Sequence, residues 1–167
     1  VIGLCMTEGK EGIDHNLDGR WQKVQTIVDY AKSVGFPQQD LFIDPLVMPV
    51  GAVTEGPKLT LELIRRCNQA GIRTAIGASN VSFGLPARDI FNATFIAQAV
   101  EAGVSAVIID TTNEVTRKIV AAAEVLIGRR KLDKHLKALY ITSETKSKAK
   151  TESASTLRSL VYDGDQN

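Results

Sequence analysis

The sequence has few aromatic residues and almost no net charge. Aromatic residues make up 5% of the 167 positions, and the formal net charge is +1. A nucleic-acid surface usually combines clustered positive charge with aromatic rings on which bases stack, so we expect no nucleic-acid partner. The opening apolar run, residues 1–6, is too short for a signal peptide or a membrane span, so we also expect no membrane partner.

Cysteine and histidine are scarce as well. Cys5 and Cys67 lie in apolar surroundings, which indicates buried free thiols rather than a disulfide or a metal site, and reduced thiols fit a cytoplasmic protein. His15 and His135 lie in polar segments, without the spacing of a metal site or a histidine-based catalytic triad. Without metal-spaced ligands we expect no metal in the site. No lysine ends a predicted strand, which argues against a Schiff base, and no P-loop is present to cradle a phosphate.

A strand–loop–helix pattern occurs four times along the chain. The predicted strands are residues 1–6, 41–43, 74–76 and 106–109. Each precedes apolar residues at helical spacing: Trp21, Val24, Ile27, Val28, Ala31 and Val34; then Leu61, Ile64 and Cys67; then Phe91, Phe95 and Ala99; and finally Ile119, Ala123 and Leu126. Strands that are apolar throughout are expected to be buried on both faces. The pattern predicts a doubly wound sheet or half of a (β/α)₈ barrel, and the lack of a dinucleotide-binding glycine motif favours the half-barrel.

The four units occupy residues 1–128, and the composition changes beyond them. Residues 129–156 begin with a basic stretch around a short helical pattern and continue into Ser-, Thr- and Lys-rich linker composition. A renewed apolar pattern in residues 157–167 predicts either the first helix of a further domain or an ordinary frayed terminus. Because the chain opens on Val1 within an apolar run typical of a buried strand, we interpret it as a fragment of a longer protein.

Polar side chains follow all four predicted strands, where barrel enzymes carry their reacting groups. They are Thr7, Glu8, Asp44, Ser79, Asn80, Ser82 and Asp110. A helix cap or a turn explains Ser82 and Asp110 as well as ligand contact does. Asp44 lies between apolar segments and needs hydrogen-bond donors that a cap does not obviously supply, so a ligand role is favoured there. Neutral and acidic groups of this kind suit a flat polar heterocycle better than a phosphate or a metal ion.

Two segments carry a family resemblance: Leu41-Phe42-Ile43-Asp44-Pro45-Leu46-Val47-Met48-Pro49 and Gly77-Ala78-Ser79-Asn80-Val81-Ser82-Phe83-Gly84-Leu85-Pro86-Ala87-Arg88. Together with Asn92-Ala93-Thr94-Phe95, they resemble the pterin-binding barrel of methyltetrahydrofolate:corrinoid methyltransferases. That group includes the corrinoid iron–sulfur protein methyltransferase and the folate module of cobalamin-dependent methionine synthase. The resemblance covers about residues 1–128. It implies a (β/α)₈ barrel of the dihydropteroate synthase-like type, of which this chain would supply strands five to eight.

The resemblance also implies an activity and its residues. The N5-methyl group of methyltetrahydrofolate, or of a related tetrahydropterin, would pass to the cobalt of a corrinoid (cobalamin) on a partner protein or a fused domain. Residues 157–167 would begin the helical cap of such a domain, and the full-length protein would form a homodimer. Asp44 would hydrogen-bond the pterin ring, and Asn80 would reach N5 as the catalytic residue. The other substrate-binding residues would be Ser79, Ser82, Arg88 and Asp110.

The sequence departs from the family at Phe83, where some members carry Gln, and it lacks the upstream Asp and Asn that complete the family's pterin site. Dihydropteroate synthase is the nearest alternative, since it shares the barrel and the pterin pocket. That family usually carries cations after the seventh and eighth strands, where this chain has residues 79–81 and 110–112 without any. A further alternative is an inactive, truncated pterin-binding remnant, because half a barrel has two open sheet edges and an unfilled core.

Overall fold

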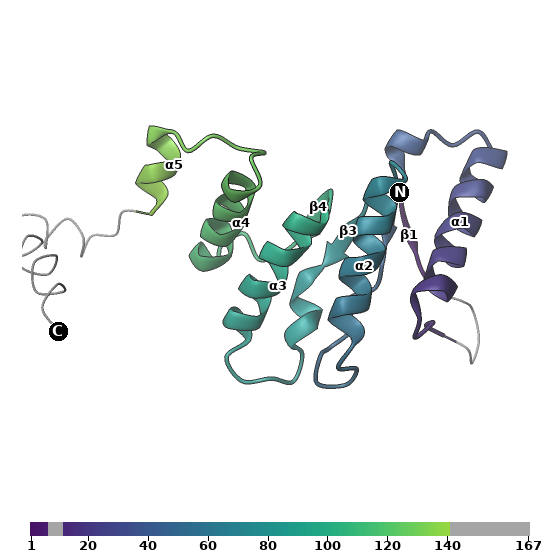
Figure 1. Ribbon diagram of the computed structural model, residues 1–167, viewed down its shortest axis with the longest axis horizontal. Coiled ribbons are helices and arrows are strands. Elements are labelled where there is room, and N and C mark those ends of the chain that lie inside the picture. Colours follow the sequence, from purple (N-terminus) through teal and green to yellow (C-terminus); the bar gives the residue numbers. More distant parts are fainter. Residues whose placement is uncertain (7–11, 141–167) are drawn as a thin grey trace, which may run out of the picture. The chain divides into compact units, whose positions relative to one another are not determined.

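A computed structural model describes residues 1–6 and 12–140. The chain divides after Arg130, and the two parts are described separately. The first part alternates strands and helices along the chain (Figure 1). Its elements are β1 (Ile2–Leu4), α1 (Leu17–Ser33), η1 (Gln38–Asp40), β2 (Phe42–Asp44), α2 (Gly56–Gln69), β3 (Ala75–Gly77), η2 (Ala78–Ser82), α3 (Arg88–Ala102), β4 (Ala106–Ile108) and α4 (Glu114–Leu126). The predicted alternation is confirmed, although each strand is only 3 residues long.

The strands are parallel and lie in chain order. β1 pairs with β2, and β3 pairs with β4. A single bridge between Ile43 and Thr74 joins the two pairs, where the Ile43 amide donates to the Arg73 carbonyl at 2.8 Å. Because all strands run the same way, their carboxyl ends meet at one edge of the sheet, and the loops that follow them lie together there.

The core consists of two clusters of buried residues, one on each side of that bridge. The first gathers α1, β2 and Cys5, which follows β1, around Val24 and Ile43. The second gathers β3, α3 and α4 around Ile76. Helix α2 belongs to both: it contributes Leu63 and Cys67 to the first cluster, and its Leu61 and Ile64 lie in the second. Both cysteines are free and buried, as predicted.

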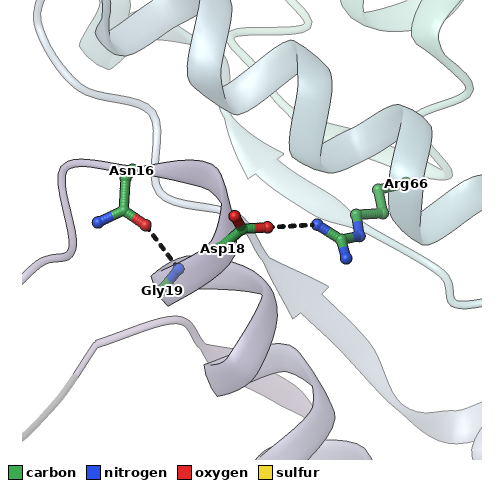
Figure 2. A network of polar contacts seen from close by, with 4 residues as sticks. All are labelled: Asn16, Asp18, Gly19 and Arg66. Atoms are coloured by element: carbon green, nitrogen blue, oxygen red, sulfur yellow. Dashed lines mark hydrogen bonds and ion pairs between the residues drawn. The ribbon is translucent and has the colours of Figure 1, made fainter.

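Polar contacts fix the start of α1 and join it to α2 (Figure 2). The Asn16 side chain caps α1 by accepting a hydrogen bond from the Gly19 amide at 2.7 Å. One residue into the helix, Asp18 pairs with Arg66 of α2 at 3.0 Å. The Arg66 guanidinium also lies 4.6 Å from the centroid of the Trp21 ring, an arrangement that favours cation–π attraction. Helix α1 is therefore positioned at its amino end by side chains as well as by the core.

The expectation that the strands are buried on both faces is wrong for the outer strands. Ile2, Leu4 and Ile108 are 51%, 43% and 60% exposed. Gly3 faces Ile27 of α1, so strand alternation turns Ile2 and Leu4 to the opposite face, which no described element covers. The described strands thus form an open sheet, and a closed barrel is not seen among them. Val34, expected on the buried stripe of α1, is 60% exposed because it lies beyond the last helical residue.

The second part contains one described helix, α5 (Lys134–Leu139), within the basic stretch. The Asp133 carboxylate caps it by accepting from the Leu136 amide at 2.8 Å. The predicted linker beyond it and the predicted module at 157–167 lie outside the described residues. Over the stretch that is described, no helix has the length and apolarity that a bilayer crossing requires.

Candidate functional site

The predicted site residues lie along the carboxyl edge of the sheet, apart from Thr7 and Glu8, which fall outside the described residues. Asp44 is the last residue of β2. β3 leads directly into η2, which carries Ser79, Asn80 and Ser82. Asp110 follows the end of β4 by two residues. The parallel topology therefore brings three loops with polar side chains to one edge.

Asp44 lies at a tight turn. Its Oδ1 accepts a hydrogen bond from the Leu46 amide at 2.9 Å, across Pro45. Leu46 has a positive φ of 62°, an uncommon conformation for a residue other than glycine. Burial raises the pKa of the Asp44 carboxyl, and the Leu46 hydrogen bond partly opposes that shift. Among the described residues Oδ2 accepts no hydrogen bond, so half of this carboxylate is available to a ligand.

The register of the sheet determines which way Asp44 faces. Asp44 is paired with Leu4, whose side chain is exposed on the uncovered face, and Ile43 beside it is fully buried against the helices. Paired residues in neighbouring strands point to the same face, so the Asp44 carboxylate points to the uncovered face. In a closed barrel this face would be the interior.

Asn80 connects η2 to the loop after β2. Its Nδ2 donates to the main-chain oxygen of Val47 at 2.5 Å. A main-chain bond from the Val50 amide to the Val81 oxygen, 3.0 Å long, joins the same two loops. The Asn80 side chain is otherwise exposed. Asp44 and Asn80 thus belong to two loops that are directly hydrogen-bonded to each other.

Ser82 and Arg88 form a second polar group beside η2. Ser82 is 0% exposed, and its hydroxyl donates to Oδ1 of Asn92 at 2.7 Å. Arg88 donates from Nε to that hydroxyl at 3.0 Å and from Nη2 to the Ser79 oxygen at 2.9 Å. The Ser82 hydroxyl is therefore used inside the protein to hold η2 against α3, whereas Ser79 and Arg88 are exposed.

Asp110 forms a turn before α4. Its Oδ1 accepts from the Thr112 amide at 2.8 Å and from the Thr112 hydroxyl at 2.6 Å. The hydroxyl hydrogen bond is the main reason that the pKa of Asp110 lies below its ordinary value. The sequence left open whether Asp110 forms a cap or turn or contacts a ligand, and the structure shows the turn. Asp110 also borders a polar hollow of about 330 Å³ lined by Ser79, Arg88, Asp89, Asn92, Ile96, Ile109, Asp110, Asn113 and Thr116.

A shallower hollow on the same side adjoins Asn80. Its volume is about 430 Å³, and its lining residues are Gly77, Ser79, Asn80, Arg88, Ile108, Ile109 and Asp110. The two hollows share four of these residues, Ser79, Arg88, Ile109 and Asp110. The structure therefore brings Ser79, Asn80, Arg88 and Asp110 together around one concave region beside the loop that carries Asp44.

Sequence reasoning missed Arg20, which is 0% exposed. Its Nη1 donates to the main-chain oxygens of Pro45 and Leu46 at 2.8 and 3.0 Å. Its Nε donates to the Asp14 oxygen at 2.9 Å. Burial lowers the pKa of Arg20. A signal was present in the sequence, because Arg20 precedes Val24 by four residues and so lies on the apolar stripe of its helix.

Cys5 lies beneath the same turn but is chemically inert. Its amide donates to the Asp44 oxygen at 3.2 Å, and its side chain is fully buried. Burial raises the pKa of the Cys5 thiol to about 12. Only a thiolate acts as a nucleophile or a metal ligand, so Cys5 supports the turn by packing and does not supply a reactive group.

Comparison with known proteins identifies the family. The profile of the family described as "Pterin binding enzyme" matches residues 7–110, which is more than half of the chain. The chain is also 27% identical, over 132 residues, to the methylcorrinoid:tetrahydrofolate methyltransferase of Eubacterium limosum. That alignment covers 77% of this chain and 48% of the relative, so the chain spans about half the length of the curated relative it matches. The family match includes the turn at Asp44 and all of η2 and ends at Asp110, and the chain belongs to the pterin-binding enzyme family.

Proposed function

We propose that this chain forms part of a methyltransferase that moves a methyl group between N5 of a tetrahydropterin, such as tetrahydrofolate, and the cobalt of a corrinoid. The observation that carries the proposal is that Asp44 and Asn80 lie on two loops that are hydrogen-bonded to each other at one edge of the sheet. Membership of the pterin-binding family and the name of the E. limosum relative support it. The corrinoid is a second substrate, carried by a partner protein or a fused domain.

Asp44 is assigned to pterin binding. Its Oδ2 has no hydrogen bond among the described residues, and its Oδ1 accepts only one. A carboxylate in this state can receive two parallel hydrogen bonds from a pterin ring N–H and the adjacent exocyclic amine, and charge-assisted bonds of this kind are strong. The partial burial that raises the pKa of Asp44 also lowers the local dielectric, which strengthens such bonds.

Asn80 is assigned to the reacting nitrogen. Its side-chain amide carries two hydrogens on Nδ2, of which the bond to the Val47 oxygen uses one. The second can donate to N5, which gains electron density when the methyl group leaves. A donor fixed at that point stabilises the transition state more than the ground state. Ser79, Arg88 and Asp110 would bind more distant parts of the substrate around the shared hollow, and Ser82 would hold Ser79 and Arg88 in place.

The direction of transfer does not alter these roles. The name of the E. limosum relative has tetrahydrofolate as the methyl acceptor, whereas sequence reasoning assigned methyltetrahydrofolate as the donor. A catalyst lowers the barrier of one equilibrium in both directions, and the same nitrogen either loses or gains the methyl group. The chain's own residues bind and orient the pterin, which is a catalytic contribution without any covalent intermediate on the protein.

The uncovered sheet face supports the half-barrel interpretation. Ile2, Leu4 and Ile108 expose apolar surface on the face to which Asp44 points. We propose that four further βα units close this face into a (β/α)₈ barrel of the dihydropteroate synthase-like type, and that activity requires them. The same exposed face favours one second candidate, a pterin-binding remnant without activity of its own.

The remaining assignments follow from the same proposal. Residues 129–156 would connect the barrel to a corrinoid domain that begins within residues 157–167. The full-length protein would be a cytoplasmic homodimer.

Binding and transfer assays test the function. The chain is joined to the first four βα units of a methyltetrahydrofolate-binding barrel and titrated with methyltetrahydrofolate in a calorimeter. Transfer to Co(I) cobalamin is followed by visible absorbance. Binding together with transfer is the expected result. Binding without transfer in either direction would contradict the methyltransferase and favour the pterin-binding remnant, and the absence of binding would contradict both. Condensation of p-aminobenzoate with a pterin pyrophosphate would instead identify a dihydropteroate synthase.

A further inference from the structure

Arg20 is a buried cation with no carboxylate bonded to it among the described residues. Within the described ranges its side chain makes three hydrogen bonds, all to main-chain oxygens: one at Asp14 and two in the turn after Asp44. Its Nη2 is buried and has no partner among the described residues. Burying a charged group without an ion pair is costly, so packing alone does not account for an arginine here.

The carbonyls that Arg20 binds belong to the turn that orients Asp44. Pro45 and Leu46 follow the carboxylate directly, and Leu46 has the positive φ noted above. A backbone in that conformation persists only where its surroundings hold it. Two donors do so at the Leu46 oxygen: Nη1 of Arg20 at 3.0 Å and the Thr60 hydroxyl at 2.9 Å. The Leu46 amide, on the other side of the same residue, then bonds the Asp44 carboxylate.

The same turn supports Asn80. Val47 follows Leu46 immediately, and its oxygen accepts the Asn80 side-chain amide. A displacement of Leu46 would therefore move the acceptor that orients Asn80 as well as the amide that orients Asp44. A single buried guanidinium thus acts on both residues assigned to the pterin, although it does not lie next to either of them in the sequence.

We propose that Arg20 is a positioning residue for pterin binding, which fixes the turn at Pro45 and Leu46 and thereby sets the orientation of the Asp44 carboxylate and the Asn80 amide. The proposal rests on the proposed function, because it assigns to Arg20 the geometry of the site described there. Arg20 acts through the main chain and does not contact the substrate.

The first test uses the 167-residue chain without ligand. In Arg20→Met, we expect the Leu46 amide to exchange with solvent on the order of 10-fold faster relative to amides within α2, because the turn opens locally. Loss of the Leu46 hydrogen bond should also raise the pKa of Asp44, measured by ¹³C NMR of its carboxyl. Arg20→Lys keeps a donor, so its Leu46 exchange rate and its Asp44 pKa should lie between those of Arg20→Met and of the wild type. The matched control is Arg66→Met, which removes another arginine between α1 and α2 that makes no bond to this turn.

The second test measures methyltetrahydrofolate affinity in the completed barrel. If Arg20 acts through Asp44, the losses caused by Arg20→Met and Asp44→Asn will not add, since the second substitution already removes the orientated charge. Arg66→Met should leave the affinity unchanged. Additive losses would mean that Arg20 affects the site only through general stability, and would overturn the proposal.

The two proposals fail in distinguishable ways. A folded Arg20→Met chain with the wild-type Leu46 exchange rate and the wild-type Asp44 titration would overturn the inference. Should that variant not fold, Arg20→Lys takes its place: the single ammonium group cannot reproduce all three guanidinium bonds, and a folded Arg20→Lys chain with the wild-type Leu46 exchange rate and Asp44 titration would overturn the inference equally. If the unsubstituted barrel binds no methyltetrahydrofolate, the proposed function fails, whereas the exchange and titration results still decide whether Arg20 controls the turn.

Discussion

The side-chain amide of Asn80 donates to the main-chain oxygen of Val47 at 2.5 Å, so a residue after β3 is bound directly to the loop after β2. The two loops come from neighbouring strands that share only one bridge within the sheet. The connection at the edge is therefore made by side chain and loop as much as by strand pairing, and substitutions at Asn80 will affect the loop that carries Asp44.

Replacing Asn80 by alanine should impair methyl transfer more than pterin binding. We expect the single-turnover rate to fall on the order of 10²-fold or more, because an oriented donor at N5 acts mainly in the transition state. The affinity should fall less, through the lost bond to Val47. On the completed barrel, stopped-flow absorbance of cobalamin gives the single-turnover rate and calorimetry gives the affinity for the pterin. An unchanged single-turnover rate would remove Asn80 from the mechanism.

Replacing Asp44 by asparagine should separate stability from binding. The raised pKa of Asp44 means that folding disfavours its ionised form. Its contribution to stability is therefore full below the unfolded pKa and is lost as pH rises through the folded pKa. At pH 7 the charge is a cost to the fold, and asparagine keeps an oxygen for the Leu46 amide.

We accordingly expect Asp44→Asn to unfold at an equal or higher urea concentration than the wild type at pH 7, with the difference vanishing toward pH 3. Methyltetrahydrofolate affinity should fall about 10- to 100-fold, the usual value of a hydrogen bond to a charged group. A clear loss of stability at pH 7 would show that the carboxylate serves the fold rather than a ligand.

The two cysteines should make the protein sensitive to alkali. Burial raises the pKa of Cys5 and of Cys67 to about 12, from an ordinary value of 9.0. Each raised thiol pKa contributes stability that is full below about pH 9 and is lost as pH rises toward 12, because the unfolded chain ionises first. Urea midpoints measured between pH 7 and pH 11 should therefore fall more steeply than those of a Cys5→Ala, Cys67→Ala double variant. Parallel curves for the two proteins would contradict the burial effect.

Two glycines that end helices should differ in their tolerance of alanine. Gly103 ends α3 at φ 98°, and a Cβ there would lie 2.5 Å from Nδ2 of Asn68. Gly128, after α4, has φ 76° but no atom within 4 Å of a Cβ. Gly128→Ala should cost about 1–2 kcal/mol for the left-handed backbone alone. Gly103→Ala should cost about 1–3 kcal/mol more, for the steric overlap.

Urea denaturation of both variants measures the difference between Gly103 and Gly128. Combining Gly103→Ala with Asn68→Ala should recover part of the additional loss, since it removes the side chain that the new Cβ would meet. Equal losses for the two single substitutions would show that the Asn68 contact contributes nothing.

The alternation of strands and helices could be predicted because short apolar runs and helical apolar stripes differ in period, and both are strong in this chain. Pro57 lies in the first turn of α2, a position where proline is favoured because the amide hydrogen it lacks would have no partner within the helix. Strand burial was misjudged at Ile2 and Ile108, because one sequence shows that a residue is apolar but not which neighbour covers it. The open face of the sheet has no local sequence signal.

The candidate site likewise has a part that the sequence predicts and a part that it does not. Asp44 and Asn80 could be placed at the sheet edge, because polar residues directly after buried strands are informative in parallel folds. The contacts that organise them could not, since Arg20 reaches main-chain oxygens at Pro45 and Leu46, and any residue type presents such oxygens. Charge on an apolar helical stripe was the available signal for Arg20.

The single bridge between β2 and β3 makes a crease in the sheet. On each side of it a strand–helix–strand unit has its own apolar cluster, and α2 spans the two. Asp44 lies on one side of this crease, and Asn80 and Asp110 lie on the other. The bonds from Asn80 to Val47 and from Val50 to Val81 cross this crease at the carboxyl edge and hold the two loops together there. A change in the angle between the two halves of the sheet would therefore alter the distance between Asp44 and Asp110, while the bond to Val47 keeps Asn80 beside the loop that carries Asp44.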